Sequence, residues 1–357
     1  QLDFIDKSQL YCQIEPANLF KHLPPIVKLW DLIKYYVELR SVAKKSCLRH
    51  FAEFCSDQVQ KRRLYELSSR EGADEYNKFI RTPSVGILDL LKEFNSCKPS
   101  LEALIANIPC FTPRYYSVSN APQNEKDHQF KAAFTVINLD PICNRTGSQL
   151  YGVTTGHLYR VFCSKNDINE SLAQLNLNGN KVPTIKLFKR KNPHFKLPKN
   201  ALTPLILVGP GTGVAPFIGF LEQRKKLKNL IPIGETWLFF GCRTSQDFIY
   251  KNQLESFTKD HILTRLCVCL SREPNQSDDS PKYVQDLLMK EGNFIFKLIH
   301  SKKAMIYVCG DVKMMSVNVF NAFVKIAEEF GKMNHENAVK YIRELQSEKK
   351  YLQDVWL

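Results

Sequence analysis

The sequence predicts a fold in which a helical segment and a β-rich segment precede an α/β domain built on a parallel sheet. Residues 26–110 space their apolar side chains by three and four, as amphipathic helices do. Residues 113–182 alternate apolar and polar side chains over short segments, most clearly at 130–139. From about Thr203, continuous apolar runs alternate with helical stretches. That last order is typical of βαβ units, whose strands are buried on both faces.

The length of 357 residues accommodates about two domains. The boundary between the two halves is expected near residues 197–200, in a Leu-Pro-Lys-Asn segment. Hydrophobic residues make up 44% of the chain and charged residues 24%. This composition is ordinary for a globular protein and excludes the disordered, collagen-like and disulfide-dense classes.

The net charge of +14 leaves an acidic partner, an anionic ligand or nucleic acid as possible binding partners. No basic motif interleaved with aromatic residues is present, so we do not expect a nucleic-acid-binding protein. The basic run 181–199 holds seven Lys or Arg residues and no acidic residue. It is either the solvated face of a strand or a docking surface for an acidic redox partner.

The eleven cysteines form no Cys-x-x-Cys pair, which favours reduced thiols in a cytoplasmic protein and no zinc site. No unbroken apolar stretch is long enough to cross a membrane, and no signal peptide is recognisable at Gln1. The chain does not begin with Met, and we therefore expect a fragment of a longer protein.

A glycine loop follows the apolar strand expected at 205–209, and a helix with Pro216 in its first turn follows the loop. Glycines at a helix N-terminus let a phosphate approach the free backbone N–H groups. Gly211, Thr212 and Gly213 are therefore candidate phosphate-binding residues, although a simple tight turn explains the same pattern. The loop does not match the GxGxxG fingerprint.

Ser271 and Arg272 follow the strand expected at 264–270, and Lys282 and Tyr283 come ten residues later. Ligands of open α/β sheets bind at the carboxyl ends of strands. Basic and hydroxyl groups suit an adenosine phosphate, so this set favours NADP over NAD. Solvated surface side chains are the alternative.

Three further features are ambiguous when each is taken alone. Cys309 stands near the end of an apolar strand, and its thiol is either reactive or simply buried. Arg114, Tyr116 and Ser117, with Gly152 to Thr155, suit a flavin and its pyrophosphate, or form a β-edge with an aromatic pair. Trp356 is either a terminal anchor or a lid over a flat cofactor.

Taken together, these segments resemble the ferredoxin-reductase-like half of the diflavin reductases, and the resemblance covers nearly the whole chain. Seven motifs occur in the family's order: RxYS at 114–117, GVTT at 152–155, GPGTGVAPFIGF at 209–220, FFGCR at 239–243, SR at 271–272, YVCGD at 307–311 and DVW at 354–356.

The resemblance implies three domains. An FAD-binding antiparallel β-barrel would take residues 1–25 and 111–200 and be incomplete at its N-terminus. A helical connecting subdomain, residues 26–110, would be inserted in it, and an NADP-binding α/β domain would follow at 201–357. An FMN-binding, flavodoxin-like domain is expected upstream of this chain.

The resemblance also assigns roles to single residues. The residues expected at FAD are Arg114, Tyr116, Ser117, Gly152, Val153, Thr154, Thr155 and Trp356. Those expected at NADPH are Gly211, Thr212, Gly213, Cys242, Arg243, Ser271, Arg272, Lys282, Tyr283, Gln285 and Asp311. The expected hydride-transfer set is Ser117, Cys309 and Asp354, with Trp356 as a gate that must move.

The expected activity is hydride transfer from NADPH to FAD, followed by passage of electrons through FMN. Segments 61–67, 72–81 and 350–356 favour the branch of the family that reduces the cobalamin of methionine synthase. The microsomal branch, which serves haem-thiolate monooxygenases, is similar over the same stretches. A chain that binds NADP(H) without transferring electrons is a third possibility.

Overall fold

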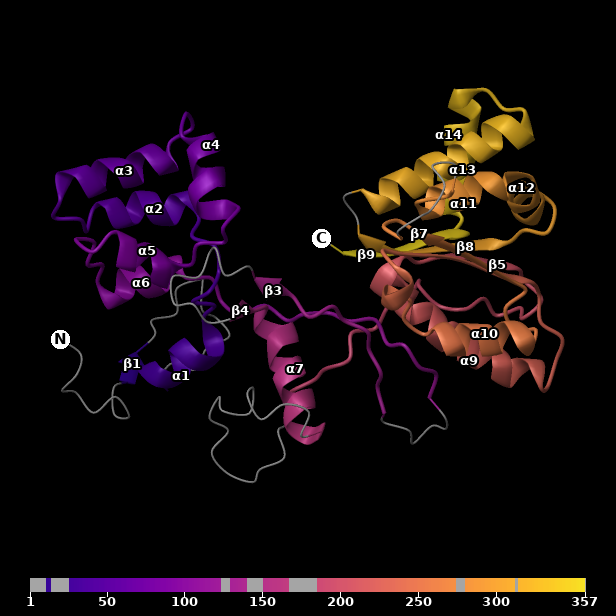
Figure 1. Ribbon diagram of the computed structural model, residues 1–357, viewed down its shortest axis with the longest axis horizontal. Helices are drawn as coiled ribbons and strands as arrows, with labels where there is room; N and C mark the ends of the chain where they lie inside the picture. Colours follow the sequence, from indigo (N-terminus) through magenta and orange to yellow (C-terminus); the bar gives the residue numbers. More distant parts are fainter. Residues whose placement is uncertain are drawn as a thin grey trace. The chain divides into compact units, whose positions relative to one another are not determined.

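The computed structural model describes most of the chain (Figure 1). The described residues are 11–13, 26–122, 129–139, 150–166, 185–273, 280–311 and 314–356. The chain divides into two compact units. Unit 1 comprises residues 1–114 and 136–181, and unit 2 comprises residues 115–135 and 182–357. The predicted FAD-binding range 111–200 is thus shared between the units, and only 11–13 of the predicted range 1–25 is described.

Unit 1 is mainly helical between residues 29 and 107, where the three-to-four spacing of apolar residues predicted helices. Asp57 and Ser100 cap two of the helices by accepting hydrogen bonds from backbone N–H groups. Leu48, Phe51 and Leu64 are fully buried at the centre. The helices are α1 (Leu29–Asp31), the π-helical turn η1 (Leu32–Tyr36), α2 (Lys45–Ala52), α3 (Gln58–Ser68), α4 (Ala73–Tyr76), the π-helical turn η2 (Asn77–Arg81), α5 (Ile87–Glu93) and α6 (Leu101–Asn107).

The strands of unit 1 are short. β1 (Tyr11–Gln13) pairs antiparallel with β2 (Ile26–Lys28), and β3 (Asn138–Leu139) pairs antiparallel with β4 (Leu150–Tyr151). Residues 133–137, inside the strand predicted at 130–139, have no strand partner among the described residues, so that prediction is wrong there. The β-barrel itself stays a prediction.

The β-rich prediction is also wrong for α7 (Val153–Asn166), a helix of 14 residues. Thr155 and Cys163 are buried and Tyr159 is half-buried, so the inward positions recur every four residues. That spacing belongs to a helix and outweighs the local preference of β-branched residues for strands.

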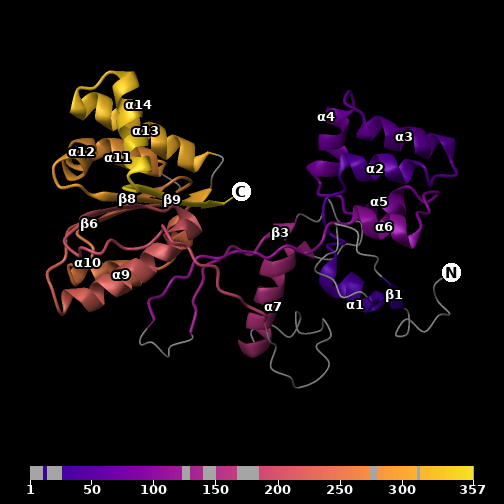
Figure 2. The ribbon, with the colours of Figure 1, turned by 180° about the vertical axis from the view of Figure 1, so that it is seen from behind.

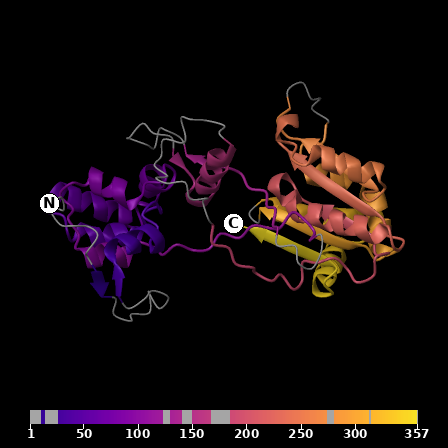
Figure 3. The same cartoon turned by 90° about the horizontal axis from the view of Figure 1, so that it is seen from below.

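Unit 2 contains the predicted parallel sheet, extended by one strand. Its order is β7-β6-β5-β8-β9, and every neighbouring pair is parallel. Figure 3 shows the strands of this orange-to-yellow part of the chain side by side. The strands are β5 (Leu205–Val208), β6 (Thr236–Cys242), β7 (Arg265–Leu270), β8 (Met305–Asp311) and β9 (Tyr351–Trp356). β9 was not predicted as a strand.

Helices cover both faces of this sheet (Figures 1 and 2). One face packs on α9 (Ala215–Lys228) and α10 (Lys251–Lys259), in a core that includes Phe217 and Phe240. The other face packs on α11 (Val284–Lys290), α12 (Gly292–His300), α13 (Met315–Gly331) and α14 (His335–Ser347). All four residues of β5 are fully buried, as a central parallel strand requires.

No helix within the described part of the chain is long and apolar enough to cross a membrane.

Candidate functional site

The five parallel strands of unit 2 end at one edge of the sheet, where loops and helix N-termini gather polar groups. β8 and β9 are neighbours, with Cys309 opposite Asp354 and Asp311 opposite Trp356. Open α/β sheets bind ligands at this edge. The candidate site therefore lies at the carboxyl ends of these strands.

Ser117, Cys309 and Asp354 lie together, although the chain separates them widely. The Ser117 hydroxyl donates a hydrogen bond of 2.9 Å to Oδ2 of Asp354. Cys309 is fully buried, and burial raises the pKa of its thiol, with the Asp354 carboxylate acting in the same direction and Ser117 opposing. Cys309 therefore carries a neutral thiol at physiological pH.

Asn192 is a further contact of Asp354 that the sequence analysis missed. Its Nδ2 lies 3.4 Å from Oδ1 of Asp354, and its own Oδ1 accepts a 3.1 Å hydrogen bond from the backbone N–H of Phe195. Phe195 is buried against Phe217 and Tyr307. The sequence Asn-Pro-His-Phe at 192–195 could have predicted the turn that holds Asn192, because Asn side chains commonly bond the backbone a few residues onward in turns.

Trp356 ends β9 with 42% of its surface exposed. The backbone of Trp356 pairs with that of Asp311 in the neighbouring strand β8. The Asp311 carboxylate in turn accepts a hydrogen bond of 3.3 Å from the Met314 N–H. An exposed indole on a fixed backbone can change rotamer without disturbing the sheet.

The predicted glycine loop joins β5 to α9 through a short 3₁₀ turn, η4 (Gly211–Val214). Gly211 has a φ of +55°, and a Cβ there would meet nothing within 4 Å. At Gly213 a Cβ would come within 2.2 Å of the Cys309 carbonyl oxygen. The first glycine therefore leaves the outer side of the loop open, and the second allows the loop to lie directly against β8.

The residues predicted for the adenosine phosphate follow β6 and β7. The N–H groups of Ser271 and Arg272 bond the carbonyls of Cys242 and Arg243, at 2.9 Å and 2.8 Å. These bonds continue the β6–β7 pairing beyond the strands and bring the four residues together. Arg272 is exposed.

Arg243, in contrast, is paired with Asp247 at 3.2 Å on the surface. Cys242 is half-buried, and burial raises the pKa of its thiol to about 11. The Cys242 thiol is therefore neutral at physiological pH.

Lys282, Tyr283 and Gln285 surround the start of α11. Asp286 accepts hydrogen bonds from the N–H groups of Lys282 and Tyr283, at 3.0 Å and 2.8 Å. These bonds fix the backbone that carries both side chains, and the Tyr283 ring is 56% exposed. Gln285 is half-buried on the helix.

Two sets of the predicted FAD residues belong to unit 1. Arg114 forms an ion pair of 2.8 Å with Glu38 and donates to the Thr112 carbonyl at 2.6 Å. Gly152, Val153 and Thr154 lie at the N-terminus of α7, where a helix presents backbone N–H groups. Thr155 is buried, and its hydroxyl accepts a 3.3 Å hydrogen bond from the Ile137 N–H.

Tyr116 and Ser117 belong instead to unit 2, where the Tyr116 ring packs edge-on against Phe134 at 6.1 Å.

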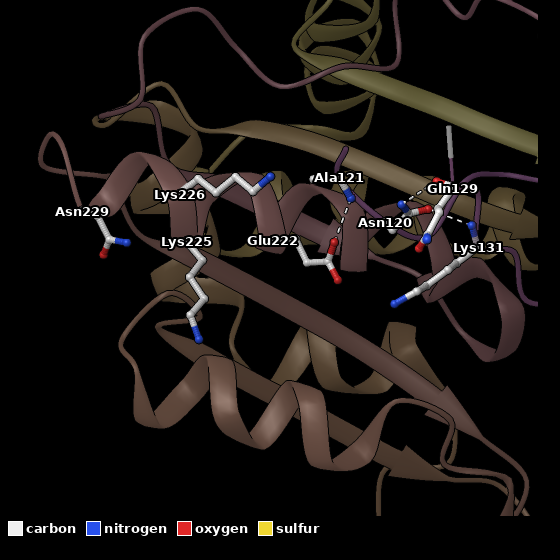
Figure 4. Close-up of a pocket in the computed structure, with 8 residues that line it drawn as sticks. All are labelled: Asn120, Ala121, Gln129, Lys131, Glu222, Lys225, Lys226 and Asn229. Carbon is white, nitrogen blue, oxygen red and sulfur yellow. Dashed lines mark hydrogen bonds between the residues drawn. The ribbon is translucent and has the colours of Figure 1, made fainter. Parts of the chain in front are cut away.

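A separate pocket of about 330 Å³ lies on the outer side of α9 (Figure 4). Glu222 on that helix accepts a 2.8 Å bond from the Ala121 N–H, and Asn120 accepts one of 2.7 Å from the Lys131 N–H. None of the residues predicted from sequence for the site lines this pocket.

Family models match both parts of the chain. Residues 9–157 match an FAD-binding domain, and residues 207–319 match the NAD-binding domain of oxidoreductases. The second match begins inside β5 and includes the glycine loop. The fold and the two matches define the class of protein as a flavin- and nicotinamide-dependent oxidoreductase.

Curated relatives narrow this class. Methionine synthase reductase of Rattus norvegicus is 37% identical over 347 residues, which are 95% of this chain and 49% of the relative. Its counterpart in Homo sapiens is 36% identical over the same shares. NADPH–cytochrome P450 reductase of Musca domestica is 34% identical over 91% of this chain and 45% of the relative.

This chain is therefore similar both to methionine synthase reductases and to NADPH–cytochrome P450 reductases over 91–95% of its length. It spans about half the length of the curated relatives it matches.

Proposed function

We propose that this chain transfers a hydride from NADPH to FAD and that, in the whole protein, electrons continue through FMN to the cobalamin of methionine synthase. The observation that carries the proposal is the grouping of Ser117, Cys309 and Asp354 beside the glycine loop. These groups come from three separate segments, and Cys309 and Asp354 lie near the carboxyl ends of β8 and β9, the edge at which α/β sheets bind nucleotides.

The loop after β5 fits a pyrophosphate. Because Gly211 has no side chain and faces open space, oxygen atoms of a phosphate can approach the backbone N–H groups of the loop. Arg272 and Lys282 offer positive charge for a 2′-phosphate, and Tyr283 offers an exposed ring for stacking. Thr212, Gly213, Cys242, Arg243, Ser271, Gln285 and Asp311 complete the proposed NADPH contacts.

The FAD contacts proposed here are Arg114, Tyr116, Ser117, the segment 152–155 and Trp356. The N-terminus of α7 suits the pyrophosphate, because its backbone N–H groups and helix dipole attract anions. Arg114 has a planar guanidinium that can bind two phosphate oxygens at once. It would have to leave Glu38, its partner in this structure, or share its charge with it.

A bound nicotinamide would supply the hydride, and a bound flavin ring would be its acceptor. Asp354 would offer negative charge to a nicotinamide ring that becomes positive on losing its hydride, and the bonds from Ser117 and Asn192 hold both carboxylate oxygens in position. Cys309 remains an uncharged, polarizable thiol. These residues align and stabilise the reacting groups, and no nucleophile is required.

The choice of acceptor rests on similarity. The methionine synthase reductases match at 36–37% identity and the cytochrome P450 reductases at 34–35%. We assign the flavodoxin-like FMN domain to the part of the relatives that this chain does not span. We also place the whole protein in the cytoplasm, as expected for a partner of methionine synthase.

The hydride step is tested by adding NADPH anaerobically to the FAD-loaded chain. We expect the flavin absorbance to bleach, and we expect Ser117→Ala to slow bleaching by at least about tenfold. Ser301→Ala, an exposed serine beyond α12, is the matched control and should bleach at the normal rate. A yellow protein that NADPH leaves unbleached would contradict the proposal and favour binding without electron transfer.

The acceptor is tested with the full-length protein. We expect NADPH-dependent reactivation of oxidised methionine synthase and little reduction of a microsomal haem-thiolate monooxygenase. The reverse preference would assign the protein to the other branch of the family and leave the hydride step intact.

A further inference from the structure

Cys55 and Cys97, in unit 1, face each other across a short antiparallel bridge. Cys55 follows the C-terminus of α2, and Cys97 follows the C-terminus of α5. Neither residue belongs to the flavin or nicotinamide site proposed above, so the inference below does not depend on that function.

The backbone hydrogen bonds around the bridge define the geometry of the pair. The Lys98 N–H bonds the Phe54 carbonyl at 3.1 Å, and the Ser56 N–H bonds the Ser96 carbonyl at 3.4 Å. These bonds flank the two cysteines, which therefore form a non-hydrogen-bonded antiparallel pair. The Cα atoms of such a pair lie about 4.5 Å apart, with their side chains close together. A disulfide needs a Cα separation of about 4.4–6.8 Å.

The two thiols also point the same way. Both donate to the carbonyl oxygen of Phe51, with Sγ–O distances of 3.7 Å for Cys55 and 3.2 Å for Cys97. Both residues are buried, with 7% and 5% of their surfaces exposed. A bond between the two sulfurs would replace weak thiol hydrogen bonds, including one between Cys55 and Cys97 themselves, and would require no change in strand register.

We propose that Cys55 and Cys97 form a dithiol that a disulfide oxidant, such as oxidised glutathione, converts to an intramolecular disulfide. One cysteine thiolate attacks oxidised glutathione and releases one glutathione thiolate. The other cysteine thiolate attacks the mixed disulfide and releases the second. The two cysteines lose two electrons, and the two thiol protons end on two molecules of reduced glutathione.

Burial makes this reaction slow. The pKa of the Cys97 thiol is raised to about 12, mainly by desolvation, so little thiolate is present at neutral pH. The reaction proceeds when the turn that carries Cys97 opens briefly. The product would tie the segment after α2 to the segment after α5 and close a loop that contains α3, α4, η2 and α5.

The test is peptide mapping of the FAD-loaded chain after incubation with oxidised glutathione. We expect a peptide pair joined between Cys55 and Cys97 under non-reducing conditions, with a mass loss of about 2 Da. We also expect a rise of several degrees in the temperature of unfolding, reversed by dithiothreitol. Cys47→Ala is the matched control, since Cys47 is equally buried in α2 but lies outside the bridge, and this variant should form the same link.

The half-buried Cys110 and Cys242 report whether the oxidant has reacted. Glutathione adducts at these two residues without a link between Cys55 and Cys97 would overturn the proposal. A link from Cys47 to either residue would overturn it equally. The mapping needs no substitution, so the result does not depend on whether Cys55→Ala or Cys97→Ala folds.

Discussion

Asp354 is the residue on which the candidate site is centred. Each of its carboxylate oxygens has a donor on a different segment, Ser117 on one side and Asn192 on the other. Cys309 lies opposite it in the neighbouring strand. A carboxylate held in this way keeps its orientation without help from a ligand, which is the condition for electrostatic preorganisation.

Trp356 gives the first prediction at the residue scale. Because its side chain is partly exposed and its backbone is held by β8, Trp356→Ala should leave the fold intact. If the indole covers the flavin face, its removal should lower the preference for NADPH over NADH. The measurement is the ratio of kcat/KM for the two nucleotides. Trp30→Ala, which removes an exposed indole from unit 1, should leave that ratio unchanged.

Gly211 and Gly213 of the glycine loop should respond differently to substitution by alanine. Gly213→Ala places a Cβ against the Cys309 carbonyl and should lower the free energy of unfolding by about 3 kcal/mol. Gly211→Ala meets open space and should cost about 1 kcal/mol, from its positive φ alone. Urea unfolding of both variants checks this order. Equal losses would show that the close approach to β8 is not a constraint.

At the scale of single elements, β6 begins with a buried hydroxyl. Thr236 is fully buried, and its Oγ1 has no hydrogen-bond partner among the described residues. Thr236→Val should therefore raise the free energy of unfolding by about 1 kcal/mol, measured by urea titration. Thr264 is the matched control because its hydroxyl accepts a 3.0 Å bond from the Thr236 N–H. Thr264→Val should lose stability, and a loss in both variants would contradict the prediction.

The central strands could be predicted because their sequences are continuous apolar runs. β5, β6, β7 and β8 lie where those runs were found, since a strand covered by helices on both faces excludes polar residues from most positions. β9 was missed because Tyr351, Gln353 and Asp354 give it a mixed pattern typical of an edge strand. The segment of α7 was predicted to be β-rich because its β-branched residues favour strands locally. The helix depends on which side chains the rest of the protein buries, and local composition does not show this.

The candidate site was predictable only in part. The motifs identified the segments that carry Ser117, Cys309 and Asp354, but residue spacing cannot show that their side chains meet. Asn192 was missed because its position depends on Phe195 filling a space beside Tyr307, which is a tertiary contact. The glycine loop was recognised from the sequence. That position 213 requires a glycine follows from its contact with the Cys309 carbonyl, which only the three-dimensional structure shows.

At the scale of the whole molecule, buried thiols couple stability to alkaline pH. Burial raises the pKa of Cys47 and Cys269 from 9.0 to about 12. Between these values the unfolded chain loses thiol protons that the folded chain keeps, so the unfolded state is favoured as pH rises. We expect the free energy of unfolding to fall from about pH 8 to about pH 10.

Cys269→Ala tests the size of this coupling. Cys269 is 3% exposed, and its removal should reduce the fall in stability between the two pH values by about 1 kcal/mol. The measurement is urea unfolding of both proteins at each pH under reducing conditions. An identical pH dependence in the two proteins would mean that the Cys269 thiol does not contribute.

The strand order β7-β6-β5-β8-β9 places two groups of candidate site residues at different positions along one edge of the sheet. Arg272 follows the strands on one side of the glycine loop, and Cys309 and Asp354 lie on the other. A long dinucleotide laid across that edge would have its distinguishing phosphate and its reactive ring at opposite ends. Under the proposed function, protein engineers could therefore redesign which nucleotide this chain accepts without altering Ser117, Cys309 or Asp354.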